Sequence, residues 1–355
     1  MPGHYLQNAF NLPHPIIQAP MAGGPTTPEL VAAVTNAGGL GTLAASFLNP
    51  EQMVAAATAI RALTSGPFAI NLFILPEPIV DVHVAEQGLA DLQATYQALG
   101  CPLQLPKKWA ERFLPQFEAL LEIKPAAASF TFGILTKAQM LALKAADIAI
   151  IGTATTVAEA RAWAEIGADA VCVQGFEAGG HRGTFINDID DSLVGLMALV
   201  PACVDAVTIP VIAAGGIMDG RGIVAAQALG AAAVQLGTAF LSCPEAALPQ
   251  PYLTALNAAS GDQTRLTRLF SGKHARGIVN GFMQDHRHAE AAVPAYPIQN
   301  ALTGPLRAAA KAKGDPNYLS LWAGQGVGLS RRLGAAQLVA QLVREAQMVR
   351  DKLLG

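Results

Sequence analysis

Short apolar runs recur along this chain, and most are followed by glycine or polar residues and then by a stretch with helical spacing. This alternation predicts strands that are buried on both faces, each leading through a loop into a helix. Such strands are predicted at residues 15–23, 40–45, 68–74, 126–133, 148–153, 168–173, 209–214 and 231–236. Eight alternating units favour an α/β fold of the TIM (β/α)8 barrel type over a doubly wound sheet.

Helix starts are predicted from capping residues as well as from spacing. Thr27 and Asn49 each precede a proline, which favours the first position of a helix. Two helical patches, at residues 79–99 and 107–123, separate the third and fourth strands, so this connection is longer than one barrel helix. Residues 335–354 have helical spacing and are predicted to form the last barrel helix.

The strand–helix alternation stops after residue 241. The region that follows contains most of the late prolines, arginines and histidines of the chain. We therefore expect residues 1–241 and 319–355 to form the TIM barrel, and residues 242–318 to form a smaller substrate or lid domain inserted after the eighth strand.

Composition narrows the class of protein. The chain is 52% hydrophobic and 14% charged, so it can bury a large core, and it leaves a homo-oligomer possible. A net charge of −3 without a basic run gives no reason to expect nucleic-acid binding. The uncharged stretches 30–50 and 222–244 are broken by glycines, which argues against membrane spans. Four scattered cysteines and a start without a secretory pattern favour a cytoplasmic protein.

A glycine-rich turn with a histidine follows the sixth strand, where residues 174–183 read Gln-Gly-Phe-Glu-Ala-Gly-Gly-His-Arg-Gly. Glycines let backbone approach a ligand closely, and histidine is suited to proton transfer near neutral pH. We predict that His181 is catalytic, although a loop histidine is often only a surface residue. Arg182 could steer an anion, but such a residue is more often a surface cation.

The seventh and eighth strands also end in glycines, Gly215-Gly216 and Gly237, the latter followed by Thr238. Loops at these two positions of many barrels bind phosphate through backbone N–H groups. The alternative is that these glycines only form tight turns. No metal site is predicted, because the histidines lack the spacing of metal ligands.

Four segments, residues 18–24, 174–183, 235–240 and 321–326, together resemble the nitronate monooxygenases, formerly called 2-nitropropane dioxygenases, and the class I members in particular. The resemblance spans nearly the whole chain and implies an FMN-dependent TIM barrel. It implies that an alkyl nitronate, typically propionate 3-nitronate, is oxidised with O2 to an aldehyde or oxo acid and nitrite. Two alternatives remain: an FMN barrel that uses NAD(P)H, such as a quinone reductase or an enoyl-acyl carrier protein reductase, and a non-catalytic flavin-binding protein.

The resemblance also implies roles for individual residues. His181 would lie near the flavin, where a protonated imidazole could bind the nitronate anion and a neutral one could take a proton from a nitroalkane. Lys273 stands where the family segment commonly has arginine, which leaves the charge of the pocket open. The implied flavin contacts are Met21, Ala22, Asn71, Gln174, Gly179, Gly216, Gln235, Leu236, Gly237 and Thr238, and the implied substrate contacts are Tyr252 and Tyr296.

Overall fold

A parallel barrel forms the centre of the structure, a computed structural model that describes residues 12–77 and 79–354. Its strands lie in the order β1-β9-β8-β6-β5-β4-β3-β2, and a bridge between Ile17 and Leu40 joins the two edges. The predicted TIM barrel is confirmed. The strands are β1 (Ile16–Gln18), β2 (Gly41–Ala44), β3 (Phe68–Phe73), β4 (Ala127–Thr131), β5 (Ala149–Ala154), β6 (Ala170–Gln174), β8 (Val211–Ala214) and β9 (Ala233–Leu236).

Side chains on each strand alternate between the barrel interior and the helix layer, as the pleat requires. On β9, Ala233 packs inside the barrel whereas Val234 packs against the helices. Alanines together with Ile17, Ile151 and Ile212 fill the barrel interior. Towards the carboxyl ends of the strands the interior positions become polar, with Asn71, Thr131 and Gln174. The sequence therefore places its polar chemistry at the end of the barrel where active sites of this fold lie.

The barrel helices begin where the capping residues predict. The Thr27 hydroxyl accepts a hydrogen bond from the Leu30 amide at 3.1 Å, and Asn49 and Gln52 form a capping box. The helices around the barrel are α2 (Pro28–Asn36), α3 (Pro50–Leu63), α6 (Phe113–Ile123), α7 (Lys137–Ala145), α8 (Val157–Glu165), α9 (Leu196–Ala206), α10 (Gly220–Ala228) and α15 (Ala335–Leu354), with the short α11 (Thr238–Leu241) after β9. Single 3-10 turns lie at Asp190–Ser192, Pro244–Ala246, Gly261–Gln263, Arg287–Ala289, Pro316–Tyr318 and Val327–Leu329.

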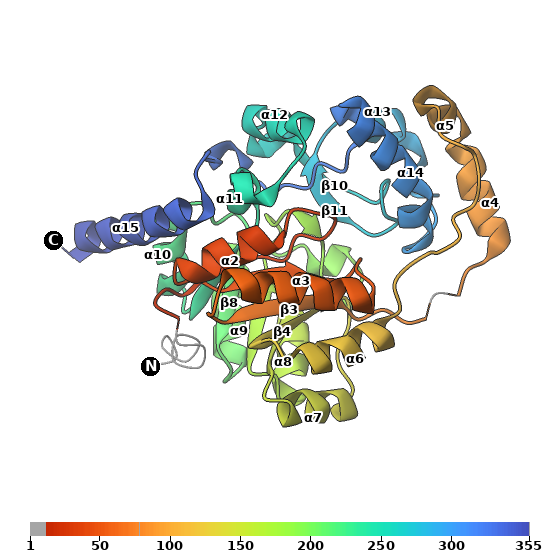
Figure 1. The fold of residues 1–355 in the computed structure, drawn as a ribbon. Helices are drawn as coiled ribbons and strands as arrows, with labels where there is room; N and C mark the ends of the chain where they lie inside the picture. The colour runs from red at the N-terminus through yellow and green to blue at the C-terminus, as the bar shows by residue number, and fades with distance from the viewer. Residues whose placement is uncertain (1–11, 78, 355) are drawn as a thin grey trace.

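A second layer, here called the cap, covers one end of the barrel (Figure 1). It contains a small antiparallel sheet in the order β10-β11-β7 and the helices that pack around it. Its elements are α4 (Val82–Asp91), α5 (Gln93–Leu99), α12 (Gln250–Ala258), α13 (Gly281–Asp285), α14 (Ile298–Lys313), β7 (Gly180–His181), β10 (Thr264–Thr267) and β11 (Ala275–Ile278).

The cap draws on more of the chain than the segment 242–318. Helices α4 and α5 come from the insertion after β3, and their apolar residues join one buried cluster with Phe270, Phe282 and Leu302. The Tyr96 hydroxyl, on α5, donates to the Leu302 carbonyl of α14 at 2.5 Å. The division at residues 242 and 318 stays a prediction, and the packing adds α4 and α5 to the cap side of it.

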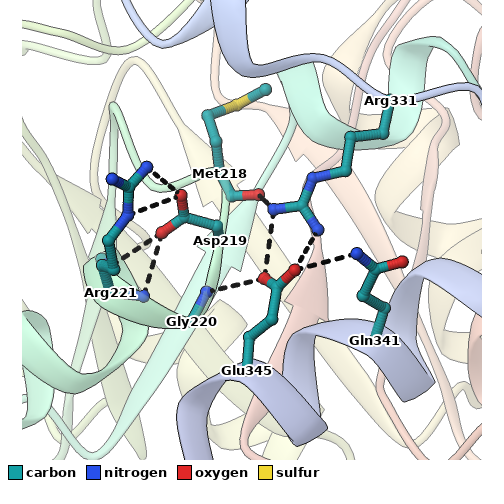
Figure 2. Close-up of polar contacts among 8 residues, drawn as sticks. Met218, Asp219, Gly220, Arg221, Arg331, Gln341 and Glu345 are labelled. Carbon is teal, nitrogen blue, oxygen red and sulfur yellow. Dashed lines mark hydrogen bonds and ion pairs between the residues drawn. The ribbon is translucent and has the colours of Figure 1, made fainter. Parts of the chain in front are cut away.

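A polar network fastens the last barrel helix to the loop after β8 (Figure 2). The Arg331 guanidinium donates to both Glu345 carboxylate oxygens, at 2.6 and 3.1 Å, and to the Met218 carbonyl at 3.4 Å. Glu345 also accepts from Gln341 and from the Gly220 amide at the start of α10. These bonds lower the pKa of Glu345, although partial burial opposes them. The network fixes the segment that continues from the Gly215-Gly216 turn.

Two further expectations concern the whole chain. Over residues 12–77 and 79–354, no helix combines the length and apolar character needed to cross a bilayer. The four cysteines are unpaired. The expectation that no secretory signal is present rests on the first residues of the chain, which lie outside the described residues.

Candidate active site

A cavity of about 700 Å³ lies between the carboxyl ends of the barrel strands and the cap. None of the described residues that line it is Asp or Glu, whereas two cationic residues of α14, Arg307 and Lys311, line it. The cavity brings together twelve of the fourteen residues predicted from the sequence. They are Met21, Ala22, Asn71, Gln174, Gly179, His181, Gly215, Gly216, Gln235, Gly237, Thr238 and Tyr252.

Leu236 and Tyr296 are placed elsewhere. The Leu236 side chain packs in the core between the barrel and its helices, because it alternates on β9 with Gln235, which faces the cavity. Tyr296 is not among the lining residues, but its ring centre lies 6.2 Å from the centres of both the His181 and the Phe132 rings. Tyr296 thus supports the histidine.

His181 sits on a strand that the sequence does not predict. Residues Gly180 and His181 form β7, which pairs antiparallel with β11 of the cap, and His181 lies opposite Ala275. The Gln174 side-chain amide holds the segment around His181 in place. It donates to the His181 carbonyl and accepts from the Gly183 amide, both at 2.9 Å. The side chain predicted to contact flavin therefore already positions the histidine, and its flavin contact stays a prediction.

A serine is the hydrogen-bond partner of one imidazole nitrogen of His181. His181 Nε2 lies 2.8 Å from the Ser271 hydroxyl, and this hydroxyl also lies 2.9 Å from the Lys273 carbonyl. A carbonyl only accepts, so we infer that the single hydroxyl proton of Ser271 goes to Lys273. The serine oxygen then accepts from Nε2–H. This arrangement leaves Nδ1 of His181 without a proton and available as a base.

The surroundings of His181 disfavour its charged form. The rings of Phe73, Phe132 and Trp322 have centres 6.4, 5.7 and 5.6 Å from the imidazole centre. Burial, followed by the positive charges of Lys273 and Arg307, lowers the pKa of His181 to about 3. The lowered pKa favours the neutral imidazole of the two protonation states that the sequence leaves open.

The charged neighbours of His181 in sequence are structural. Arg182 is 1% exposed and donates to the carbonyls of Gly175 and Ser192, both at 2.7 Å, so the expectation of a surface cation is wrong. Glu177 accepts from the Leu196 amide at the start of α9 with both carboxylate oxygens at 3.0 Å. Together they fix the loop between β6 and α9 without facing the cavity.

The glycine turns after β8 and β9 leave backbone donors free. Gly215 and Gly216 have φ of 123° and 69°, a region that favours glycine. In the described part of the chain, no acceptor pairs with the backbone N–H groups of Gly216, Ile217 or Gly237. The Thr238 hydroxyl accepts from the Gly324 amide at 2.9 Å, so its own proton remains available to a ligand. These donors suit an anion such as a phosphate.

Other cavity residues offer neutral polar groups. The Asn71 amide nitrogen donates to the Ser129 hydroxyl at 2.9 Å and to the Ser129 carbonyl at 3.2 Å, which leaves its oxygen towards the cavity. The Tyr252 hydroxyl is bound to the Trp322 carbonyl at 2.6 Å, so it presents mainly its ring. The loop with Met21 and Ala22 adds an uncharged wall.

Sequence reasoning missed several residues of the cavity. Trp322 belongs to a segment that carries the family resemblance but was given no role. Arg307 was not singled out, although Asn300, Arg307 and Lys311 recur at helical spacing on α14 and line the cavity together. Within the described ranges, no three His, Cys, Asp or Glu side chains come close enough to hold a metal ion.

Comparisons with known proteins agree with this geometry. The family model described as nitronate monooxygenase matches residues 6–345. A Bacillus subtilis protein named probable nitronate monooxygenase is 42% identical over 341 residues, which cover 95% of this chain and 97% of that protein. The solved structure of nitroalkane oxidase from Streptomyces ansochromogenes has a TM-score of 0.91 at 40% identity, covering 98% of this chain and 99% of the other. FabK from Thermotoga maritima has a TM-score of 0.79 at 28% identity, covering 99% and 98%.

Proposed function

The chain belongs to the nitronate monooxygenase family, and we propose that it binds FMN and oxidises alkyl nitronates with O2, propionate 3-nitronate being its substrate. The products are an aldehyde or oxo acid and nitrite. Family membership makes the protein a flavin-dependent oxidoreductase. The observation that carries the proposal is the placement of a neutral, oriented His181 in the same cavity as the glycine turns with free N–H groups.

The residues of the cavity fit FMN. The free N–H groups of Gly216, Ile217 and Gly237 and the Thr238 hydroxyl suit the phosphate, and Gly216 in its left-handed conformation exposes backbone there. Asn71 and Gln235 offer polar groups for the ribityl chain, and the uncharged loop at Met21 suits the ring system. Bound FMN supplies the electron-transfer chemistry, and the protein supplies binding, orientation and electrostatics.

His181 acts as a base in this proposal when the substrate arrives as a neutral nitroalkane. Its unprotonated Nδ1 takes the proton from the carbon next to the nitro group, and the electron pair of that C–H bond forms the nitronate. A substrate that arrives as the nitronate skips this step. The positive charges of Arg307 and Lys273 lower the pKa of His181. The same charges favour an anionic substrate next to the imidazole.

The test is oxygen consumption by the purified protein with propionate 3-nitronate, compared with NADH oxidation in the presence of a quinone. We expect a yellow protein that releases FMN on denaturation, consumes O2 with the nitronate and produces nitrite. Steady NADH oxidation with quinone and no nitronate turnover would select a reductase instead. A flavin that is bound but cannot be reduced anaerobically by nitronate would select a non-catalytic role, and a protein that cannot be loaded with FMN would refute the cofactor.

A further inference from the structure

One face of α14 brings positive charge into the cavity. Asn300, Gly304, Arg307, Ala308 and Lys311 follow one another at helical spacing, and all line the cavity. Lys311 is exposed, whereas the Arg307 side chain is partly buried at the wall. Because no described lining residue is Asp or Glu, the charge of this face is not balanced inside the cavity.

Arg307 has no anionic partner. Its Nη2 donates to the Asn300 carbonyl at 2.7 Å and to the Asn300 side-chain oxygen at 3.0 Å, and its Nε lies 3.4 Å from the Thr303 carbonyl. Within residues 12–77 and 79–354, no ion pair involves Arg307 and no acceptor pairs with its Nη1. The three bonds fix the guanidinium plane and leave the N–H groups of Nη1 for a ligand.

The charge of Arg307 persists despite its surroundings. Burial lowers the pKa of its guanidinium to about 10, so the group remains protonated at neutral pH. Taking a cation out of water without a counter-ion is costly, and an anion that enters the cavity relieves this cost. Arginine is a common partner of a carboxylate, and in Arg307 the N–H groups of Nη1 are the ones left to donate to it.

Arg307 and His181 line the same cavity, and α14, which carries Arg307, begins two residues after Tyr296, whose ring centre lies 6.2 Å from that of His181. Its positive charge contributes to the lowered pKa of His181 and acts on Tyr296 as well. The glycine turns that suit a phosphate belong instead to the barrel strands β8 and β9. The cavity therefore offers anion-binding groups from two different elements, the barrel strand ends and α14 of the cap.

From this arrangement we propose that Arg307 binds a carboxylate of the substrate and makes the enzyme select nitronates that carry a second anionic group. The inference rests on the proposed function, since it assigns the nitronate end of the substrate to His181. The carboxylate end then reaches Nη1 of Arg307, and Lys311 adds a more exposed charge at the cavity mouth. Arg307 is a specificity-determining residue here, with no part in the proton transfer.

The kinetic test compares propionate 3-nitronate with propyl 1-nitronate, which has the same number of carbons and no carboxylate. In Arg307→Gln we expect the ratio of the two kcat/KM values to fall about 100-fold, mainly through the KM of propionate 3-nitronate. This equals about 2.8 kcal/mol at 1.4 kcal/mol per factor of ten, a typical loss for a buried charged hydrogen bond. Arg307→Lys restores part of the ratio, and Arg112→Gln, at an exposed arginine far from the cavity, leaves it unchanged.

A binding test works without turnover. Succinate is a redox-inert dianion in which a carboxylate replaces the nitronate group of propionate 3-nitronate. Titration calorimetry on the FMN-loaded protein should show succinate binding that weakens about 100-fold in Arg307→Gln and less in Arg307→Lys. Flavin content, measured from its absorbance, stays at the wild-type level in both variants.

Each other outcome overturns the assignment. An equal loss with both nitronates means that Arg307 supports the site structurally, and loss of flavin means that it holds the cofactor phosphate. Unchanged succinate binding in Arg307→Gln means that the carboxylate is bound elsewhere. If the wild-type protein oxidises neither nitronate, the proposed function fails, and the succinate titration still decides whether Arg307 forms an anion site.

Discussion

Replacing Ser271 with alanine tests how His181 is made into a base. Ser271 is 1% exposed, and its oxygen is the only described hydrogen-bond partner of His181 Nε2, at 2.8 Å. When its hydroxyl proton goes to the Lys273 carbonyl, the serine oxygen accepts from Nε2–H. Ser271→Ala removes this preference, so the other tautomer, with the proton on Nδ1, becomes populated.

The size of the effect follows from the bonds that are lost. A net hydrogen bond contributes about 0.5–1.5 kcal/mol, so the preference for the productive tautomer corresponds to about 3- to 10-fold. Without this preference the two tautomers become about equally populated, so we expect kcat/KM for a neutral nitroalkane to fall by up to about two-fold. The unfolding free energy should fall by about 1–3 kcal/mol, because a buried N–H and a buried carbonyl lose their partner.

The assay compares nitroethane with ethyl nitronate, since only nitroethane needs the base. The ratio of the two kcat/KM values should fall in Ser271→Ala and recover in Ser271→Thr, which keeps a hydroxyl. Ser242→Ala is the matched control, because the Ser242 hydroxyl is also buried but has no partner among the described residues. An equal fall with both substrates, or none with either, would refute the assignment of Nδ1 as the base.

Further predictions concern the histidine, a glycine and the network of Figure 2. His181→Asn should keep FMN but lose most nitroalkane turnover, with unchanged kcat/KM contradicting a catalytic role. The unfolded chain protonates His181 below about pH 6.5 while the folded one does so only near pH 3. As the pH falls between these two values, the unfolding free energy of the wild type should therefore decrease more steeply than that of His181→Asn. The difference in slope is up to about 1.4 kcal/mol per pH unit and is measured by chemical denaturation. A β-carbon on Gly179 would lie 2.5 Å from the Gly324 nitrogen. Gly179→Ala should therefore lower the unfolding free energy by about 1–3 kcal/mol in the same assay. No change would mean that the loop adjusts freely. The partners of Glu345 lower its pKa, so its contribution to the unfolding free energy is present above about pH 4.3 and is lost at lower pH. Glu345→Gln should therefore lower the unfolding free energy by about 1–2 kcal/mol at pH 7 and by less at pH 3. An equal loss at both pH values would contradict the ion pair.

The barrel was predictable because its signals are local. Capping residues such as Thr27 and Asn49 mark helix starts, and glycines mark the strand ends. The two-residue period of a strand also determines which side chains face the cavity. Applied to residues 233–236, that period separates Gln235 from Leu236 without a structure. The Leu236 side chain faces the helices, so a ligand contact of Leu236, which stays a prediction, would use its backbone.

The surroundings of the histidine were not predictable in the same way. Ser271, Arg307 and Trp322 reach His181 or its cavity from segments at least 90 residues further along the chain. Their meeting depends on how the cap packs on the barrel, and no periodic pattern reports such long-range pairing. Arg182 shows the opposite error. Its type predicts exposure, but the backbone carbonyls of Gly175 and Ser192 make a buried site for its charge.

The two ends of the cavity depend on different parts of the fold. The turns at Gly216 and Gly237 continue directly from barrel strands, so the barrel alone determines their position. His181 is fixed from both sides, by Gln174 on the barrel and by β11 and Ser271 on the cap. Moving the cap away would separate His181 from Ser271 and break the β7–β11 pairing, while the glycine turns would keep their shape. A change that loosens the cap should therefore impair the base more than cofactor binding, so the cap is part of the active site as well as its cover.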